Sequence, residues 1–245
     1  MKQSLFTMEH ARQLTADTYE LVLSGDTSAI TAPGQFVNIQ LPGKFLRRPI
    51  SICNWTKDAL LLLVRVVGEG THDLVRCVPG TELDVLSGLG NGFDLAKGGA
   101  HPILLGGGIG IAPLYGLAQR MLEAGIAPTV GLGFRSGGDA FYLEEFGKLG
   151  CRLMVATEDG SLGTKGFVTD LARHVPECGY AFVCGPTPML KAVHGLPQLT
   201  GGQFRFEARM GCGFGACMGC SCKTKYGNKR ICREGPVLEK GEVIW

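Results

Sequence analysis

The amino-acid sequence predicts a multidomain chain: an antiparallel β-barrel, then an α/β domain with a parallel sheet, then a small C-terminal domain rich in cysteine. Short apolar runs separated by turn residues occupy the first part of the chain, and apolar runs alternate with helical patterns in the second. Five of the ten cysteines fall between positions 212 and 232. Short strands with turns favour a barrel or sandwich, and strands alternating with helices favour a parallel sheet. The predicted domains span residues 1–98, 99–206 and 207–245.

The barrel is predicted from five strand-like runs, separated in places by Pro-Gly pairs that are typical of turns. The runs are Thr18–Ser24, Gln35–Leu41, Pro49–Cys53, Leu60–Val67 and Thr81–Leu86. Phosphate-binding candidates lie at Arg48, in the run Arg48-Pro49-Ile50-Ser51, and at Gly70-Thr71. A guanidinium is a planar fork that fits phosphate, while Gly70 and Thr71 offer an amide and a hydroxyl. The alternative is a surface arginine at a turn, because arginine is usually exposed.

The second domain opens with an apolar run at Pro102–Leu105, a glycine loop, and helical spacing of apolar residues from Ile111 to Leu122. Glycines between a parallel strand and a helix let the phosphates of a nucleotide approach the backbone. The candidate residues are Gly106, Gly107, Gly108, Gly110 and Pro113. The motif departs from the Rossmann fingerprint, because Arg135 stands where an acid usually ends the next strand. A variant dinucleotide site is predicted, with a plain tight turn as the alternative.

The rest of this domain continues the alternation of strands and helices. Strands are expected at Val130–Phe134, Arg152–Thr157 and Ala181–Cys184, and helices at Tyr142–Leu149, Phe167–Arg173 and Pro188–His194. The strand Ala181–Cys184 is predicted to be the last buried strand of this domain. It ends in the run Cys184-Gly185-Pro186-Thr187-Pro188-Met189. Ligands bind at the carboxyl ends of parallel strands, so this turn, the glycine loop and the segment Thr157–Ser161 are candidates for one crevice. A plain helix start and an ordinary polar loop are the alternatives.

The most specific motif is C-x4-C-x2-C-x11-C, formed by Cys212, Cys217, Cys220 and Cys232. This spacing matches the plant-type [2Fe-2S] ferredoxin pattern, and the glycines around it let the backbone wrap closely. Zinc is the alternative, but zinc sites usually combine two closely spaced pairs of ligands. Cys222 is left out of the predicted ligand set because choosing it would turn the C-x2-C step into C-x4-C.

Composition and the remaining residues exclude several classes of function. A net charge of +2 gives no indication of nucleic-acid binding. The N-terminus lacks the apolar region of a signal peptide and no run is long enough to span a membrane, so a cytoplasmic protein is expected. Four scattered cysteines, Cys53, Cys77, Cys151 and Cys178, are interpreted as small apolar residues in or near cores. No nucleophile and base pair is evident, so no side chain is predicted to be catalytic.

Taken in order, R-P-I-S, G-E-G-T, G-G-G-I-G-I-A-P and C-G-P-T-P-M resemble the ferredoxin–NADP reductase family. The run Glu207-Ala-Arg-Met-Gly-Cys-Gly-Phe-Gly-Ala-Cys-Met-Gly-Cys narrows the resemblance to the electron-transfer subunits of type B dihydroorotate dehydrogenase. The resemblance implies FAD at Arg48, Pro49, Ile50, Ser51, Leu63, Val64, Arg65, Gly70 and Thr71. It implies nicotinamide nucleotide at Gly106 to Pro113 and at Cys184, Gly185, Pro186 and Met189, and [2Fe-2S] at the four predicted cysteines.

The same resemblance implies a partner and a reaction. An FMN-containing catalytic subunit would oxidise dihydroorotate, and electrons would pass through [2Fe-2S] and FAD to NAD, within a heterotetramer of two plus two subunits. The loop between Cys220 and Cys232 is short for the family. A sulfide dehydrogenase or ferredoxin:NADP transhydrogenase subunit is the alternative within the enzyme class, and a redox sensor or zinc-stabilised interaction module is the alternative outside it. The basic segment Lys223–Arg233 is either a solvated turn or a set of charges that raises the cluster potential.

Overall fold

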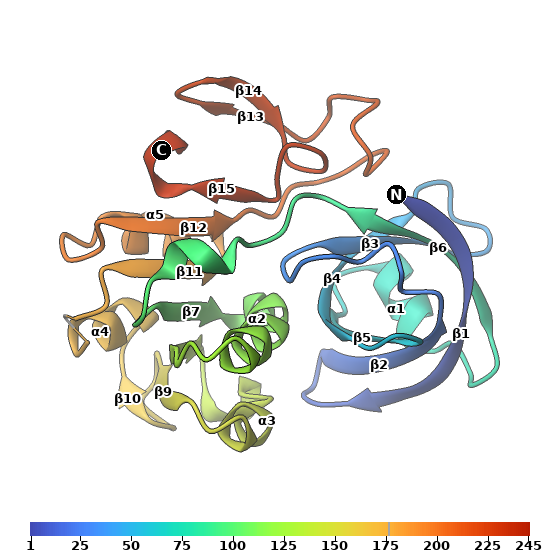
Figure 1. Ribbon diagram of the computed structural model, residues 1–245. Helices are drawn as coiled ribbons and strands as arrows, with labels where there is room; N and C mark the ends of the chain where they lie inside the picture. The colour runs from blue at the N-terminus through green and yellow to red at the C-terminus, as the bar shows by residue number, and fades with distance from the viewer. Residues whose placement is uncertain (176) are drawn as a thin grey trace.

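The computed structural model describes residues 1–175 and 177–245, and it confirms the predicted fold class. A closed barrel lies beside an open sheet flanked by helices, and the C-terminal segment lies over the end of that sheet (Figure 1). No helix among the described residues is long and apolar enough to cross a membrane.

The barrel has six antiparallel strands. They are β1 (Lys2–Gln13), β2 (Thr18–Gly25), β3 (Phe36–Gln40), β4 (Arg48–Trp55), β5 (Ala59–Arg65) and β6 (Glu82–Leu89), in the closed order β1-β2-β5-β4-β3-β6. Alternate side chains of β5, Leu60, Leu62 and Val64, fill the barrel because successive residues of a strand face opposite sides. Leu74 of α1 (Glu69–Val75) packs in the same core. Neither β1 nor α1 is among the predicted elements.

The second unit is a seven-stranded sheet in the order β10-β9-β8-β7-β11-β12-β15. Its strands are β7 (Ile103–Gly107), β8 (Thr129–Phe134), β9 (Arg152–Thr157), β10 (Thr164–Lys165), β11 (Tyr180–Cys184), β12 (Gly201–Arg205) and β15 (Val237–Glu239). All neighbouring strands are parallel except β12 and β15, which are antiparallel. The α-helices are α2 (Ala112–Glu123), α3 (Leu143–Lys148), α4 (Val168–Arg173) and α5 (Thr187–His194), and short 3₁₀ turns are η1 (Leu95–Gly98), η2 (Gly108–Ile111), η3 (Gly137–Asp139) and η4 (Lys240–Glu242).

The central strand β7 separates two apolar cores. Leu104 packs with Leu114 and Phe146 of α2 and α3, whereas Ile103 and Leu105 pack in the core that α4 and α5 cover. Because alternate residues of β7 face opposite sides, both faces of the sheet are buried, as expected for a parallel sheet.

The prediction that Cys184 ends the last buried strand of the α/β domain is wrong. Strand β12 follows it and pairs with β11 in parallel. β13 (Ser221–Thr224) and β14 (Gly227–Arg230) form a hairpin, and β15 then returns to pair with β12. The sheet therefore extends past residue 206, and the predicted domain boundaries stay predictions.

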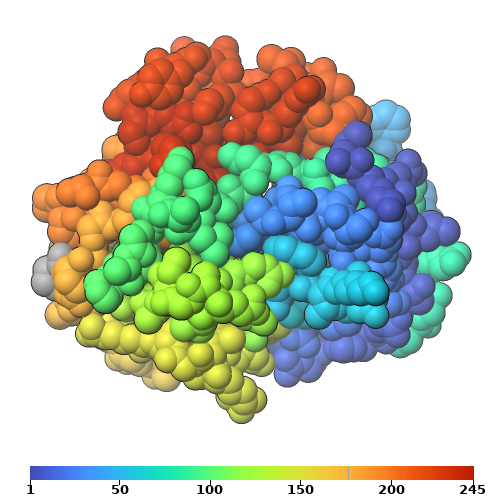
Figure 2. Space-filling view, viewed as in Figure 1, coloured from blue at the N-terminus to red at the C-terminus, as the bar shows by residue number. Residues whose placement is uncertain are grey.

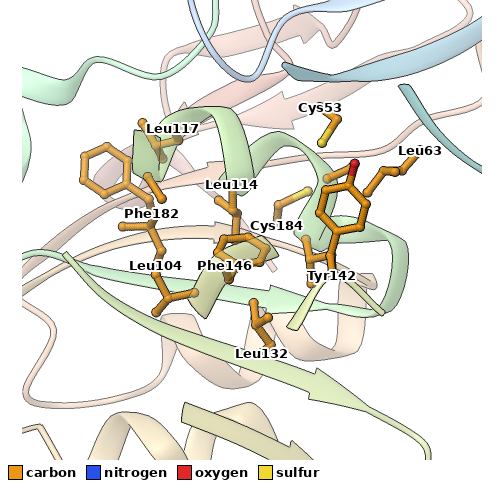
Figure 3. Close-up of a cluster of buried hydrophobic side chains, with 14 of the residues drawn as sticks. Cys53, Leu63, Leu104, Leu114, Leu117, Leu132, Tyr142, Phe146, Phe182 and Cys184 are labelled. Carbon is orange, nitrogen blue, oxygen red and sulfur yellow. The ribbon is translucent and has the colours of Figure 1, made fainter. Parts of the chain in front are cut away.

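A buried polar contact joins the barrel to the α/β domain. The Tyr142 hydroxyl donates to Glu20 Oε2 at 2.5 Å, and Arg12 donates to both Glu20 oxygens at 3.0 Å. In Figure 3 the Tyr142 hydroxyl points toward the side on which Cys53 and Leu63 of the barrel lie. Arg12 pairs with Glu20 within the barrel, and Tyr142 adds a buried hydrogen bond from the α/β domain that favours a single arrangement of the two.

This contact predicts a pH dependence of stability. Burial opposes ionisation of Glu20, but hydrogen bonds from Arg12 and Tyr142 outweigh it and lower the pKa of Glu20. A carboxyl whose pKa is lowered in the folded state stabilises the protein above its unfolded pKa of about 4.3, and that contribution is lost as the pH falls through the folded pKa. We expect the free energy of unfolding to fall more steeply between about pH 6 and pH 3 in the wild type than in Glu20→Gln, measured by urea denaturation. Equal slopes would contradict this role of Glu20.

Candidate functional site: two adjoining pockets and a cysteine loop

A pocket of about 430 Å³ lies between the barrel and the sheet and is called the interdomain pocket. Predicted site residues from both units line it. The barrel contributes Pro49, Ile50, Ser51, Leu63, Val64, Arg65 and Thr71, and the α/β domain contributes Gly107, Gly108, Gly110, Gly185 and Pro186. Strands β4 and β5 are neighbours in the barrel, which is why two sequence-distant motifs meet in one wall.

Two predicted residues, Arg48 and Gly70, lie outside that lining but beside each other. A Cβ on Gly70 would stand 1.7 Å from Arg48 Nε, so the arginine crosses the backbone at a place that only glycine leaves open. Thr71 Oγ1 accepts a hydrogen bond from the Val67 amide at 2.9 Å. Thr71 lines the interdomain pocket and Arg48 lies beside the neighbouring Gly70, so a hydroxyl and a guanidinium are available there for an anionic group such as a diphosphate.

A second pocket, of about 380 Å³, lies at the carboxyl ends of β7, β8 and β11 and is called the strand-end pocket. Gly107, Gly108, Pro186 and Met189 line it, as predicted residues of the glycine loop and the β11 turn. Its other residues include Phe134, Arg135, Asp139, Phe141, Glu158 and Thr169. An apolar cavity with a few charged groups at the ends of parallel strands is the usual position and composition of a nucleotide site.

Three predicted site residues, Gly106, Pro113 and Cys184, line neither pocket and are instead packed inside the α/β domain. Gly106 lies against the α2 side, where a Cβ would meet Ile111 Cγ2 at 2.9 Å. Pro113 is buried in the first turn of α2, and Cys184 is fully buried. Gly110 lies against the backbone of Cys184, whose carbonyl oxygen a Cβ would meet at 2.4 Å. The glycine loop therefore follows the β11 turn closely.

The four predicted ligand cysteines form two pairs. The amides of Ala216 and Cys217 donate to Cys212 Sγ at 3.2 and 3.4 Å. The amide of Cys232 donates to Cys220 Sγ at 3.4 Å. Each iron of a [2Fe-2S] cluster takes two protein ligands, so two cysteine pairs with amides directed at sulfur fit such a cluster.

The pKa values of the thiols differ across the cysteine loop. Burial opposes the Cys212 thiolate, but hydrogen bonds from the loop amides outweigh it and lower the pKa of Cys212 to about 6. Burial and the adjacent Cys220 raise the pKa of Cys232 to about 12. Burial also raises the pKa of Cys222, which packs in an apolar cluster on β13. The loop amides thus favour the thiolate form of Cys212, whereas burial favours the thiol form of both Cys222 and Cys232, so the pKa values do not separate Cys222 from the predicted ligands.

The cysteine loop has an exposed side and a buried side. Among residues 1–175 and 177–245, no three or more His, Cys, Asp or Glu side chains gather around one point, so the preference for a [2Fe-2S] cluster over zinc rests on the ligand spacing. Cys217 is exposed, together with Phe214 and Met218, whereas Cys220 and Cys232 are buried. The C-terminal segment covers one end of the molecule in Figure 2. One side of the loop therefore faces solvent and the other faces the protein interior.

The basic segment after Cys222 is partly neutralised. Lys229 forms an ion pair with Glu242, and Arg230 forms one with Glu234. The absence of acids within Lys223–Arg233 thus does not leave all of its charges free, because the fold brings acids from later in the chain.

Sequence reasoning missed several residues of the interdomain pocket. They are Phe36, Val67, Arg205, Phe206, Glu207, Ala208 and Met210. Arg205 ends β12, which was not predicted, and four of the others follow it. The signal that could have found them is the alternation of strands and helices, which predicts one more strand after the helix at Pro188–His194, with its carboxyl end at the same edge. The segment Gly201–Arg205 contains only one large apolar residue, Phe204, and so forms no apolar run of its own.

Comparisons with known protein families agree with this geometry. Residues 207–244 match the family described as iron-sulfur cluster binding domain of dihydroorotate dehydrogenase B, and residues 104–195 match the oxidoreductase NAD-binding domain. The dihydroorotate dehydrogenase B (NAD(+)), electron transfer subunit of Shouchella clausii is 41% identical over 256 residues, covering 99% of this chain and 98% of that protein. The protein of the same name from Listeria monocytogenes is 40% identical over 254 residues, covering 99% of each.

Solved structures show the same architecture. The structure of an NADH-dependent reduced ferredoxin-NADP oxidoreductase superposes with a TM-score of 0.90 at 29% identity, covering 99% of this chain and 90% of that chain. The cytochrome b5 reductase domain of Ulva prolifera nitrate reductase superposes with a TM-score of 0.64 at 17% identity, covering 81% of this chain and 92% of that one, which shows the fold alone.

Proposed function

Because this chain belongs to the family of dihydroorotate dehydrogenase B electron transfer subunits, we propose that it relays electrons through a [2Fe-2S] cluster and FAD to NAD⁺ in pyrimidine biosynthesis. The observation that carries the proposal is that the two pockets adjoin and the cysteine loop packs on the wall of one of them. Arg65 and Pro186 line both pockets. Phe36 lines the interdomain pocket and packs in one apolar cluster with Cys220 and Cys232.

The chain's own residues hold and orient the cofactors. In our assignment the barrel wall and the Arg48–Gly70–Thr71 end of the interdomain pocket bind FAD, and the strand-end pocket binds the nicotinamide nucleotide. Cys212, Cys217, Cys220 and Cys232 bind the cluster. Bound FAD would supply the exchange between the two electrons of a hydride and the single electrons of a cluster. Asn38 of the barrel donates to the Cys212 carbonyl at 3.1 Å and so holds the cysteine loop against the flavin side of the molecule.

The name of the related subunits implies a catalytic partner. We assign that role to an FMN-containing subunit that oxidises dihydroorotate to orotate, in a cytoplasmic heterotetramer of two plus two. The exposed Phe214, Cys217 and Met218 of the cysteine loop support an outlet to another protein at this point, because large apolar side chains are otherwise usually covered.

The proposal is tested by anaerobic purification followed by cofactor extraction. We expect one FAD and one [2Fe-2S] cluster per chain, reduction of both by NADH, and oxidation of dihydroorotate only after the catalytic subunit is added. Reduction by NADPH should be weaker than reduction by NADH. Two carboxylates, Asp139 and Glu158, line the strand-end pocket against one guanidinium, that of Arg135, and the carboxylates repel the added phosphate of NADPH. A colourless chain with bound zinc, or dihydroorotate oxidation by the isolated chain, would refute the proposal.

A second candidate is supported by the structural match to the NADH-dependent reduced ferredoxin-NADP oxidoreductase. In that case the chain would serve a large FAD-containing partner. Co-purification from the native host separates the two functions, because the partner subunit would carry FMN in the first and FAD in the second.

A further inference from the structure

Arg205 is a buried cation in the wall of the interdomain pocket. It is the last residue of β12, it lies opposite Cys184 of β11, and its exposed fraction is 3%. Its Nε donates to the carbonyl of Gly34 in the barrel at 2.9 Å. A guanidinium has five N–H donors, so one carbonyl leaves most of its hydrogen-bonding capacity unused.

No carboxylate neutralises this cation. Within residues 1–175 and 177–245, no acidic side chain lies within 4.0 Å of Arg205 in an ion pair, although Glu207 lines the same pocket. The nearby Cys184 does not compensate, because burial raises the pKa of its thiol to about 12 and keeps it neutral. Buried arginine is normally paired, since removal of an unpaired charge from water is costly. The missing counter-charge must therefore come from what binds in the pocket.

The position of Arg205 within the pocket indicates which part of a flavin it meets. Hydride transfer requires the flavin ring to contact the nicotinamide, so the ring belongs where the two pockets adjoin. Gly107, Gly108 and Pro186 line both pockets, and Pro186 follows Cys184 by two residues. Arg205 therefore belongs to the ring end of the pocket, whereas Arg48 and Thr71 belong to the end assigned to phosphate.

We propose that Arg205 stabilises the reduced form of the bound FAD by placing a buried positive charge beside its ring. The inference deepens the proposed function and depends on the assignment of FAD to this pocket. A hydride brings two electrons and one proton to the flavin, so the reduced flavin carries one more negative charge than the oxidised flavin. A nearby guanidinium favours the more negative form and raises the midpoint potential.

The test measures the two-electron midpoint potential of bound FAD in four full-length chains: wild type, Arg205→Lys, Arg205→Gln and Arg205→Met. Lysine keeps the charge, glutamine keeps a hydrogen-bond donor without the charge, and methionine keeps only the volume. We expect Gln and Met to reduce the preference for reduced over oxidised FAD about tenfold, which lowers the midpoint by about 30 mV. Lys should remain close to the wild type. The proposal would be overturned if the midpoint potentials of Arg205→Gln and Arg205→Met equalled that of the wild type. It would also be overturned if Arg205→Met lowered the midpoint and Arg205→Gln did not.

A matched control separates charge from folding. Arg47 is also largely buried, but it is paired with Asp84 at 2.8 Å and lines neither pocket. Arg47→Met should lower the melting temperature without shifting the flavin midpoint, whereas Arg205→Met should shift the midpoint whatever its melting temperature. If the wild-type chain binds no FAD, the proposed function itself is refuted. If the wild-type chain binds FAD and the FAD midpoint of Arg205→Gln equals that of the wild type, only the role of Arg205 is refuted.

Discussion

Serine in place of Cys220 removes the [2Fe-2S] cluster and leaves FAD bound. Cys220 is buried and receives the Cys232 amide, so serine there offers the iron a hydroxyl in the position of a thiolate. We expect iron content and the visible absorption of the cluster to fall at least about tenfold, while FAD remains near one per chain and is still reduced by NADH. Iron and sulfide analysis, with flavin extraction on the same sample, measures both.

The matched control is Cys222→Ser, two residues away. Cys222 falls outside the C-x4-C-x2-C spacing and pairs with Lys229 in the β13–β14 hairpin, so its replacement should leave the iron content unchanged. Loss of iron in Cys222→Ser with retention in Cys220→Ser would reverse the assignment of the ligand set.

Alanine in place of Gly110 disrupts the nucleotide site. A Cβ there would meet Cys184 O at 2.4 Å and Gly185 Cα at 2.7 Å, and both contacts are backbone atoms that cannot rotate away. The glycine loop and the β11 turn must separate, and a displacement of about 1 Å can cost about a hundredfold in rate. We expect stopped-flow reduction of the flavin by NADH to slow about a hundredfold, while dithionite still reduces the flavin and the cluster.

Gly147→Ala is the control for the effect of alanine itself. Gly147 lies in α3 with nothing within 4 Å of an added Cβ, so alanine there should stabilise the chain by up to about 1 kcal/mol and leave reduction by NADH unchanged. A Gly110→Ala chain that NADH reduces at the wild-type rate would show that the loop does not approach the nucleotide.

The local pattern of the sequence was sufficient for most of the fold. Arg152–Thr157 is a strand with the predicted bounds, and the helix before Gly125 begins within one residue of the expected Ile111. β1 was missed because only Phe6 and Met8 among its twelve residues are buried, so its alternation is too weak to detect. β15 was missed because a three-residue strand pairs through distant contacts and has no pattern of its own.

The candidate site was predictable where chemistry follows from local spacing. Gly107 and Gly108 of the glycine loop line the strand-end pocket, and Cys212 lies beside Cys217, as closely spaced residues of one run can. Phe36 and Arg205 were not predictable, because their place in the interdomain pocket depends on how the barrel lies against the sheet. The ion pair of Lys229 with Glu242 was not evident either, because the two residues are 13 positions apart in the chain.

The pairing of β12 with β15 limits the movement of the cysteine loop. Gln203 lies opposite Glu239 and Arg205 lies opposite Val237, so residues 206–236 leave the sheet and return to it at the adjacent strand. The two ends of this excursion are held at the spacing of neighbouring strands, about 5 Å. A segment anchored in this way does not swing between a donor and an acceptor as a tethered domain would. The path from its sulfur atoms to the interdomain pocket keeps a constant length, so we expect delivery of electrons to depend on encounters with the partner and to rise with partner concentration until the complex is saturated.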